Sequence, residues 1–148
     1  CALPICLAEG RLAEGERLVL AVDPPPGKGH IQVDYFMIDG NVAHIYPPRG
    51  PDESTKPAEI HAGDLAGTRV VIGDSRAGAV DVNEYPVQPP LGHELVLAIA
   101  SAKPLFDSTR PFVESSGTYL SSLNTAFAGQ HEPIAASTLW LETVSRHP

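Results

Sequence analysis

The most informative run of apolar residues lies between Ile31 and Tyr46, in the segment IQVDYFMIDGNVAHIY. Two apolar runs flank Asp39-Gly40, which is a strong signal for a tight β-hairpin, because a type I′ turn needs positive φ at both central residues. We therefore predict two antiparallel strands joined at this dipeptide. The predicted cross-strand pairs are Met37–Val42, Tyr35–His44 and Val33–Tyr46.

Both faces of this predicted hairpin are largely apolar. One side carries Ile31, Val33, Tyr35, Met37, Val42, His44 and Tyr46, and the other carries Phe36, Ile38, Ala43 and Ile45. Strands that are apolar on both faces are typical of a central position with cover on both sides. We expect the hairpin to lie in the middle of the fold.

Shorter apolar runs predict further strands. They cover residues 16–22, 68–72, 80–87, 95–100 and 136–144. The run LVLAIA at 95–100 is the most uniformly apolar and indicates a central strand. In the last strand Leu139 and Leu141 should face one side and Trp140 the other. We expect residues 1–14 to be a loosely packed lead-in and the Pro-rich residues 47–57 to form a solvent loop.

One helix is predicted, from Val113 to Ala128. Its apolar residues recur at spacings of three and four, Glu114 would lie in its first turn, and Gly129 would end it. The predicted fold is therefore mostly β, in a single domain of residues 1–148. We expect an antiparallel β-sandwich, or a partly open barrel, of about seven strands with this one covering helix.

Composition narrows the class of partner. A hydrophobic content of 43% with 19% charged residues is that of an ordinary globular domain. The net charge is −8 and no Lys/Arg cluster occurs, which argues against nucleic acid and anionic membrane surfaces as partners. No apolar run approaches the ~20 residues that span a bilayer. Another protein is the expected partner.

The two cysteines, Cys1 and Cys6, leave alternatives open. Cys1 followed by Ala2 suits the lipid-modified first residue of a bacterial lipoprotein, which would tether the chain to a membrane. The pair could instead close a small disulfide loop, or Cys1 could be a chain boundary without a role. No second pair with zinc-type spacing occurs, and the chain has no G-x-G-x-x-G and no P-loop. We therefore expect no metal and no cofactor.

The order of these signals resembles a known bacterial family, the DUF4384-type domain of unknown function. The matching segments are Leu12–Leu20, Val33–Phe36, Asp39–Val42, His44–Pro47, Pro89–Ser101 and Pro104–Phe106, and the similarity spans about residues 12–143. Such domains are appended to serine/threonine kinases, caspase-like proteins and other envelope-associated proteins. The family carries no established catalytic residues. The resemblance implies an accessory, non-catalytic module in a signalling or envelope protein.

One stretch suggests different chemistry. Residues 69–75, RVVIGDS, resemble the first block of GDSL hydrolases, in which a serine at a strand end is the nucleophile. That serine would be Ser75, and it would need a histidine base and an oxyanion hole. The family's Asp-x-x-His motif does not occur in this chain. The alternative is a plain Gly73-Asp74-Ser75 turn.

The six histidines are scattered and form no metal-binding pair. His44 stands out because the predicted register places it opposite Tyr35 on an apolar face. Two readings of His44 stay open: a buried histidine with a hydrogen bond to a neighbour, which would respond to pH together with Tyr35, or simply a residue at the rim.

Two surfaces are candidates for binding. The first is the loop that follows the hairpin, with Tyr46, Pro47, Pro48, Arg49 and Asp52. The second is an exposed edge strand at 68–72 that could accept a strand from a partner.

From these observations we expect a non-catalytic protein-binding or scaffolding module at the periplasmic side of the bacterial envelope. A cytoplasmic appended domain is the alternative location. The alternative functions are a small hydrolase centred on Ser75 and a small-molecule sensor with a cleft between helix and sheet.

Overall fold

The computed structural model describes residues 5–6, 10–47, 69–74, 84–108 and 110–146. These residues form nine strands and one helix. The strands are β1 Ile5–Cys6, β2 Arg11–Ala13, β3 Leu20–Val22, β4 His30–Phe36, β5 Asn41–Tyr46, β6 Val70–Ile72, β7 His93–Ser101, β8 Val113–Ser115 and β9 Ala135–Val144. The helix is α2, Ser116–Ala128.

The strands form two sheets. The larger has six strands in the order β2-β9-β7-β4-β5-β8, and the smaller has the order β1-β3-β6. Strand β7 contains the uniformly apolar run and lies in the middle of the larger sheet, antiparallel to both β4 and β9. Among the described strands, β2 and β9 form the single parallel pair. All other pairs are antiparallel, as predicted.

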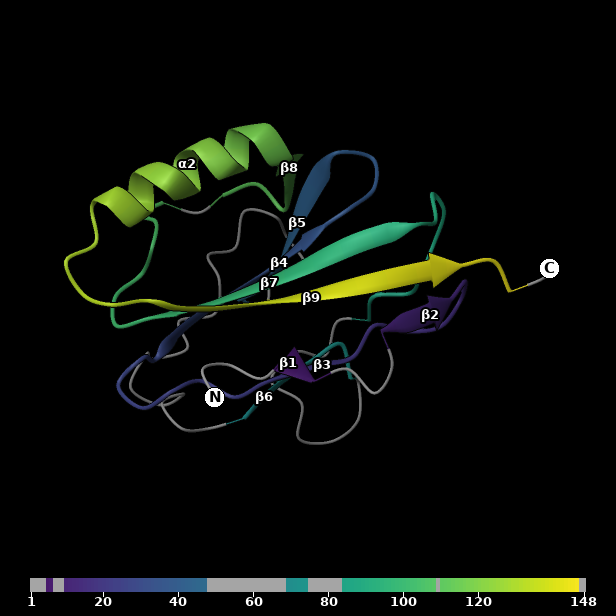
Figure 1. Ribbon diagram of the computed structural model, residues 1–148, viewed down its shortest axis with the longest axis horizontal. Coiled ribbons are helices and arrows are strands. Elements are labelled where there is room, and N and C mark those ends of the chain that lie inside the picture. Colours follow the sequence, from purple (N-terminus) through teal and green to yellow (C-terminus); the bar gives the residue numbers. More distant parts are fainter. Residues whose placement is uncertain (1–4, 7–9, 48–68, 75–83, 109, 147–148) are drawn as a thin grey trace.

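The elements are stacked in three layers. Figure 1 shows α2 above the six-stranded sheet and β1, β3 and β6 below it. The described strands do not close into a barrel. The prediction of a β-sandwich with one covering helix is therefore confirmed.

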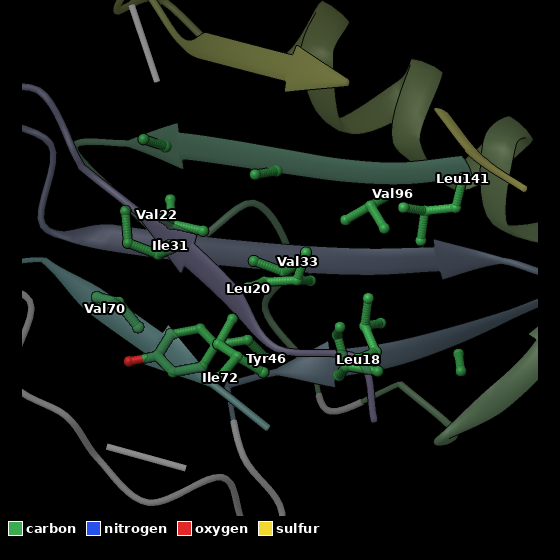
Figure 2. Close-up of a cluster of buried hydrophobic side chains, with 14 residues drawn as sticks. Leu18, Leu20, Val22, Ile31, Val33, Tyr46, Val70, Ile72, Val96 and Leu141 are labelled. Carbon is green, nitrogen blue, oxygen red and sulfur yellow. The ribbon is translucent and has the colours of Figure 1, made fainter. Parts of the chain in front are cut away.

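The six-stranded sheet is covered on both faces, so the molecule has two hydrophobic cores. The larger lies between the sheets, where Leu20 and Ile72 of the small sheet meet Val33 and Val96 of the large one (Figure 2). The smaller lies between sheet and helix and contains Val42, Ile99, Tyr119 and Leu123. This arrangement explains why both faces of the hairpin are apolar.

The hairpin turn differs from the predicted one. The N–H of Met37 donates to the carbonyl of Asn41 at 2.9 Å, and the N–H of Gly40 donates to the carbonyl of Met37 at 3.1 Å. The loop therefore has three residues, Ile38 to Gly40, with Gly40 at φ 86°. Three-residue loops with a left-handed last residue are a common hairpin type.

This longer loop shifts the register by one residue. Phe36 pairs with Val42, Asp34 with His44 and Tyr35 with Ala43, so two of the three predicted pairs are wrong. A bulge between Val33 and Asp34 then restores the third predicted pair, Val33–Tyr46. As a result Val42 and His44 face the helix, not the small sheet.

The helix begins three residues later than predicted. Val113–Ser115 forms strand β8 and pairs with β5, so Glu114 lies in a strand and not in the first helical turn. Ser115 is the N-cap, and its hydroxyl accepts a hydrogen bond from the N–H of Thr118 at 3.2 Å. The C-cap is Gly129, at the predicted end.

The described part of the N-terminal segment forms two strands that were not predicted. Residues 5–6 and 11–13 form β1 and β2, which pair with β3 and β9 respectively. The last strand matches the prediction, with Leu141 1% exposed and Trp140 68% exposed. Of the expected strand at 80–87, the described part contributes one isolated bridge, between Arg17 and Pro86. Most of the predicted loop at 47–57 lies outside the described residues.

Candidate functional site: a buried charged cluster

The main candidate site is a cluster of charged side chains between the six-stranded sheet and α2. His44 of β5 lies at its centre. Its Nδ1 is 2.7 Å from Oδ1 of Asp34 in β4, and its Nε2 is 2.8 Å from Oε1 of Glu114 in β8. The His44 side chain is 7% exposed and that of Asp34 is 0% exposed. Asp34 and His44 meet because the shifted register makes them cross-strand partners.

Asp34 accepts further hydrogen bonds on both carboxylate oxygens. Nε2 of Gln32 donates to them at 3.1 and 3.0 Å, and the hydroxyl of Tyr119 donates to Oδ2. Gln32 and Asp34 reach the same site because residues two apart in a strand share a face. Burial, followed by the adjacent Asp34 carboxylate, raises the pKa of Tyr119. The hydroxyl therefore stays protonated and able to donate.

Arg110 forms the solvent-side end of the cluster. Its Nε and Nη2 donate to the two carboxylate oxygens of Glu114 at 2.6 and 2.7 Å, a bidentate ion pair. This hydrogen bonding lowers the pKa of Glu114, with a smaller contribution from His44, and raises the pKa of Arg110. The guanidinium also lies 4.8 Å from the ring centre of Phe106 and 5.6 Å from that of Tyr119.

Every polar group of this cluster has a partner. Each nitrogen of His44 faces a carboxylate oxygen, and Arg110 pairs with Glu114. Buried charges are tolerated in proteins when they are paired in this way.

The same geometry limits the chemistry of the cluster. Both nitrogens of His44 are occupied, so in this arrangement the ring has no free position with which to take a proton from a substrate. No group of three His, Cys, Asp or Glu side chains within the described ranges is placed to hold a metal ion. The cluster joins β4, β5, β8 and α2, and we infer that it fixes the helix to the sheet.

Tyr35, the predicted partner of His44, lies on the other face of the hairpin. Its cross-strand neighbour is Ala43, and its hydroxyl donates to Glu94 of β7. Burial, then the hydrogen bond to Glu94, raises the pKa of Tyr35. Tyr35 and His44 therefore belong to two separate polar contacts, and their predicted pairing is wrong.

The predicted binding loop is only partly described. Tyr46 is 1% exposed and belongs to the core between the sheets, so it is not available to a partner. The prediction of Tyr46 as a surface residue is wrong because the bulge turns its ring inward with Ile45. Pro47 is half-buried, and Pro48, Arg49 and Asp52 lie outside the described residues.

The remaining sequence candidates lie at the limits of the described chain. Cys1 and Ser75 lie outside it, and Cys6 belongs to β1. Gly73 has φ 82° just after β6, which fits the predicted turn. Within the described residues β6 is the end strand of the smaller sheet, so the predicted edge-strand acceptor remains a prediction.

The sequence reasoning missed most members of the charged cluster. Gln32 and Asp34 had a usable signal, since they are polar residues at alternate positions of an otherwise apolar central strand. Arg110 and Glu114 had a weaker one, an opposite-charge pair four residues apart. Neither signal identifies Tyr119 as the residue that closes the cluster from the helix.

A second candidate site is apolar and lies on the sheet face next to α2. The register places Phe36, Leu95 and Trp140 in one row across β4, β7 and β9. Phe36 packs against the small hydrophobic core under α2, whereas Trp140 at the end of the row is 68% exposed. We call these three residues the Trp140 row.

Comparison of the chain with protein-family models, curated proteins and solved structures found no match. The resemblance to the DUF4384-type domain therefore stays a prediction from the sequence. Among the described residues, no helix has the length and apolar character needed to cross a membrane.

Proposed function

We propose that this domain is a non-catalytic module that binds another protein through the Trp140 row. The observation that carries the proposal is the 68% exposure of Trp140, the single tryptophan of the chain. The helix α2 packs over Val42 and Ile99, and Trp140 is not among the residues of that core.

The energetics of recognition support this reading of Trp140. Tryptophan is among the residues most enriched at the energetic centres of protein interfaces, because it buries a large apolar area with few rotatable bonds. Leu95 and Phe36 extend the same row inward and are half-buried, so a partner would meet a continuous apolar strip.

The charged cluster supports the non-catalytic part of the proposal. Its acids and bases bind one another: the nitrogens of His44 face Asp34 and Glu114, and Arg110 is held in a bidentate pair. A catalytic acid or base must instead be open to a substrate. The sequence resemblance supports a setting at the bacterial envelope for this module.

Site-specific photo-cross-linking tests the proposal. Benzoylphenylalanine is placed at position 140 and, as the control, at position 19, where Val19 is 37% exposed and adjoins the smaller sheet. In an extract of the native host, position 140 should give discrete protein adducts that position 19 does not give. Excess unlabelled wild-type chain should compete these adducts away, and Trp140→Ser should not.

Equal adducts from both positions, or adducts that the wild-type chain does not compete away, would overturn the proposal.

A further inference from the structure

We propose that the end of the molecule beside the C-terminus of α2 binds a small zwitterion, of the class of a free α-amino acid or a short peptide. This site is distinct from the Trp140 row and goes beyond the protein-binding function. A groove of about 510 Å³ lies between the segment after β7 and the turn from α2 into β9. Both segments lie at the same end of the sheet (Figure 1). The volume of the groove is in the usual range for small-molecule sites.

The groove brings together charges of both signs that do not neutralise each other. Lys103 contributes an ammonium, and Asp107 and Glu132 contribute carboxylates. Within the described chain none of these three side chains forms a hydrogen bond or an ion pair. By contrast, Arg17 is paired with Glu84, and Arg69 is paired with Asp23. The side chains of Lys103, Asp107 and Glu132 are all exposed, and a ligand that carries both a carboxylate and an ammonium would offer a partner to each sign of charge.

The helix end favours the ammonium of such a ligand. Helix α2 ends at Ala128, and Gly129 and Gln130 line the groove. The last carbonyls of a helix carry a partial negative charge, and no basic side chain lies in the last turn of α2 to offset it. Asp107 and Glu132 add two carboxylates to the same groove, one from each of the two segments that line it. Lys103 supplies a positive group for the carboxylate.

An apolar surface completes the groove. Pro104 and Phe106 line it and can contact the side chain of an amino acid. Phe106 also touches the charged cluster, because its ring centre is 4.8 Å from the Arg110 guanidinium and 6.0 Å from the Tyr119 ring. A ligand against Phe106 should therefore change the surroundings of Arg110, which gives the test an internal reporter.

The first arm of the test asks whether both charges are needed. The full chain is titrated with L-phenylalanine, with L-phenylalaninamide, which lacks the carboxylate, and with N-acetyl-L-phenylalanine, which lacks the ammonium. Amide NMR shifts should move in residues 103–107 and 129–132 and at the side-chain Nε–H of Arg110. The two blocked compounds should bind at least about tenfold more weakly. Equal binding of all three, preference for a blocked compound, or no shifts at these residues would overturn the proposal.

The second arm uses matched variants. Lys103→Met and Glu132→Gln should each raise the Kd for L-phenylalanine about tenfold, because each removes one charged partner. Arg11→Gln and Glu142→Gln remove an exposed ion pair at the β2–β9 contact and should leave the Kd within about twofold. The amide spectrum of each variant shows whether it folds. Folded groove variants with the wild-type Kd would contradict the proposed site.

Discussion

At the scale of single residues, the most informative feature is how completely the buried charges are paired. Glu114 connects His44 to Arg110, because Oε1 is 2.8 Å from the imidazole and 2.6 Å from the guanidinium. Its side chain is 9% exposed, so it depends on these partners to remain charged. Loss of its charge would remove the anion that pairs with Arg110.

The pKa of Glu114 gives a prediction about acid. The hydrogen bond from Arg110 holds this pKa below its ordinary value of 4.5 in the folded protein. A carboxyl with a lowered folded pKa stabilises the protein above its unfolded pKa, and this contribution is lost as pH falls through the folded pKa. Glu114→Gln should lower the free energy of unfolding at pH 7 by about 2 kcal/mol, the usual size for charged hydrogen bonds.

Urea unfolding of the wild type and the variant at pH 7, 5, 4 and 3 checks this loss of stability in acid. The wild-type protein should lose more stability between pH 5 and pH 3 than Glu114→Gln, whereas Glu142→Gln should follow the wild type. Parallel curves for wild type and Glu114→Gln would show that the carboxylate is not paired as described.

At the scale of elements, the hairpin loop decides which side chains meet. The three-residue loop ending at Gly40 places Asp34 opposite His44, and a two-residue loop would place Tyr35 there. Since side chains alternate along a strand, the shift of one residue exchanges the faces of β5. The charged cluster exists because of this turn.

Gly40→Val tests the turn. Gly40 has φ 86°, and no atom lies within 4 Å of the place a Cβ would occupy, so the penalty is purely conformational. We expect a loss of at least about 1–2 kcal/mol, because β-branched residues resist this region. Gly40→Asn is the control and should lose less, since asparagine adopts positive φ more readily. An unchanged melting temperature for Gly40→Val would mean that the turn is misplaced.

At the scale of the whole molecule, the six-stranded sheet contributes side chains to two hydrophobic cores. Strands β4 and β7 contribute Val33 and Val96 to the core on one face, and β7 contributes Ile99 to the core under α2 on the other. The two cores share the same strands, so loss of one should remove the support of the other. We therefore predict that the chain unfolds as a single cooperative unit.

Leu20→Ala tests this cooperativity. Leu20 is 0% exposed between the sheets, and its truncation should cost about 2–5 kcal/mol. The neighbouring Val19→Ala, at a side chain 37% exposed, should cost much less. Urea unfolding followed by helical circular dichroism and by methyl NMR should give coincident, shifted midpoints for Leu20→Ala. A helix signal that keeps the wild-type midpoint would show that the two cores unfold separately.

Local pattern in the sequence was sufficient for the class of fold and for several elements. Apolar runs placed the hairpin strands and the central part of β7. Alternation placed the inward Leu141 beside the outward Trp140, because a side chain's face depends on its parity within a strand. The end of the helix at Gly129 was also predictable from the local sequence. What alternation leaves open is which strands are neighbours and in what register.

Those open questions were decided by tertiary structure, and the candidate sites depend on them. Asp34 and His44 lie on two strands, and Arg110 and Glu114 come from a stretch about 70 residues further along; they meet only after the turn and the pairing of β8 with β5 fix the register. Helix α2 likewise decides which part of the sheet is covered and leaves Trp140 exposed. Local periodicity was enough to predict a sandwich with apolar faces, since burial follows it. Tertiary structure alone decided which charges pair and which surface stays open, because both depend on contacts between residues far apart in the chain.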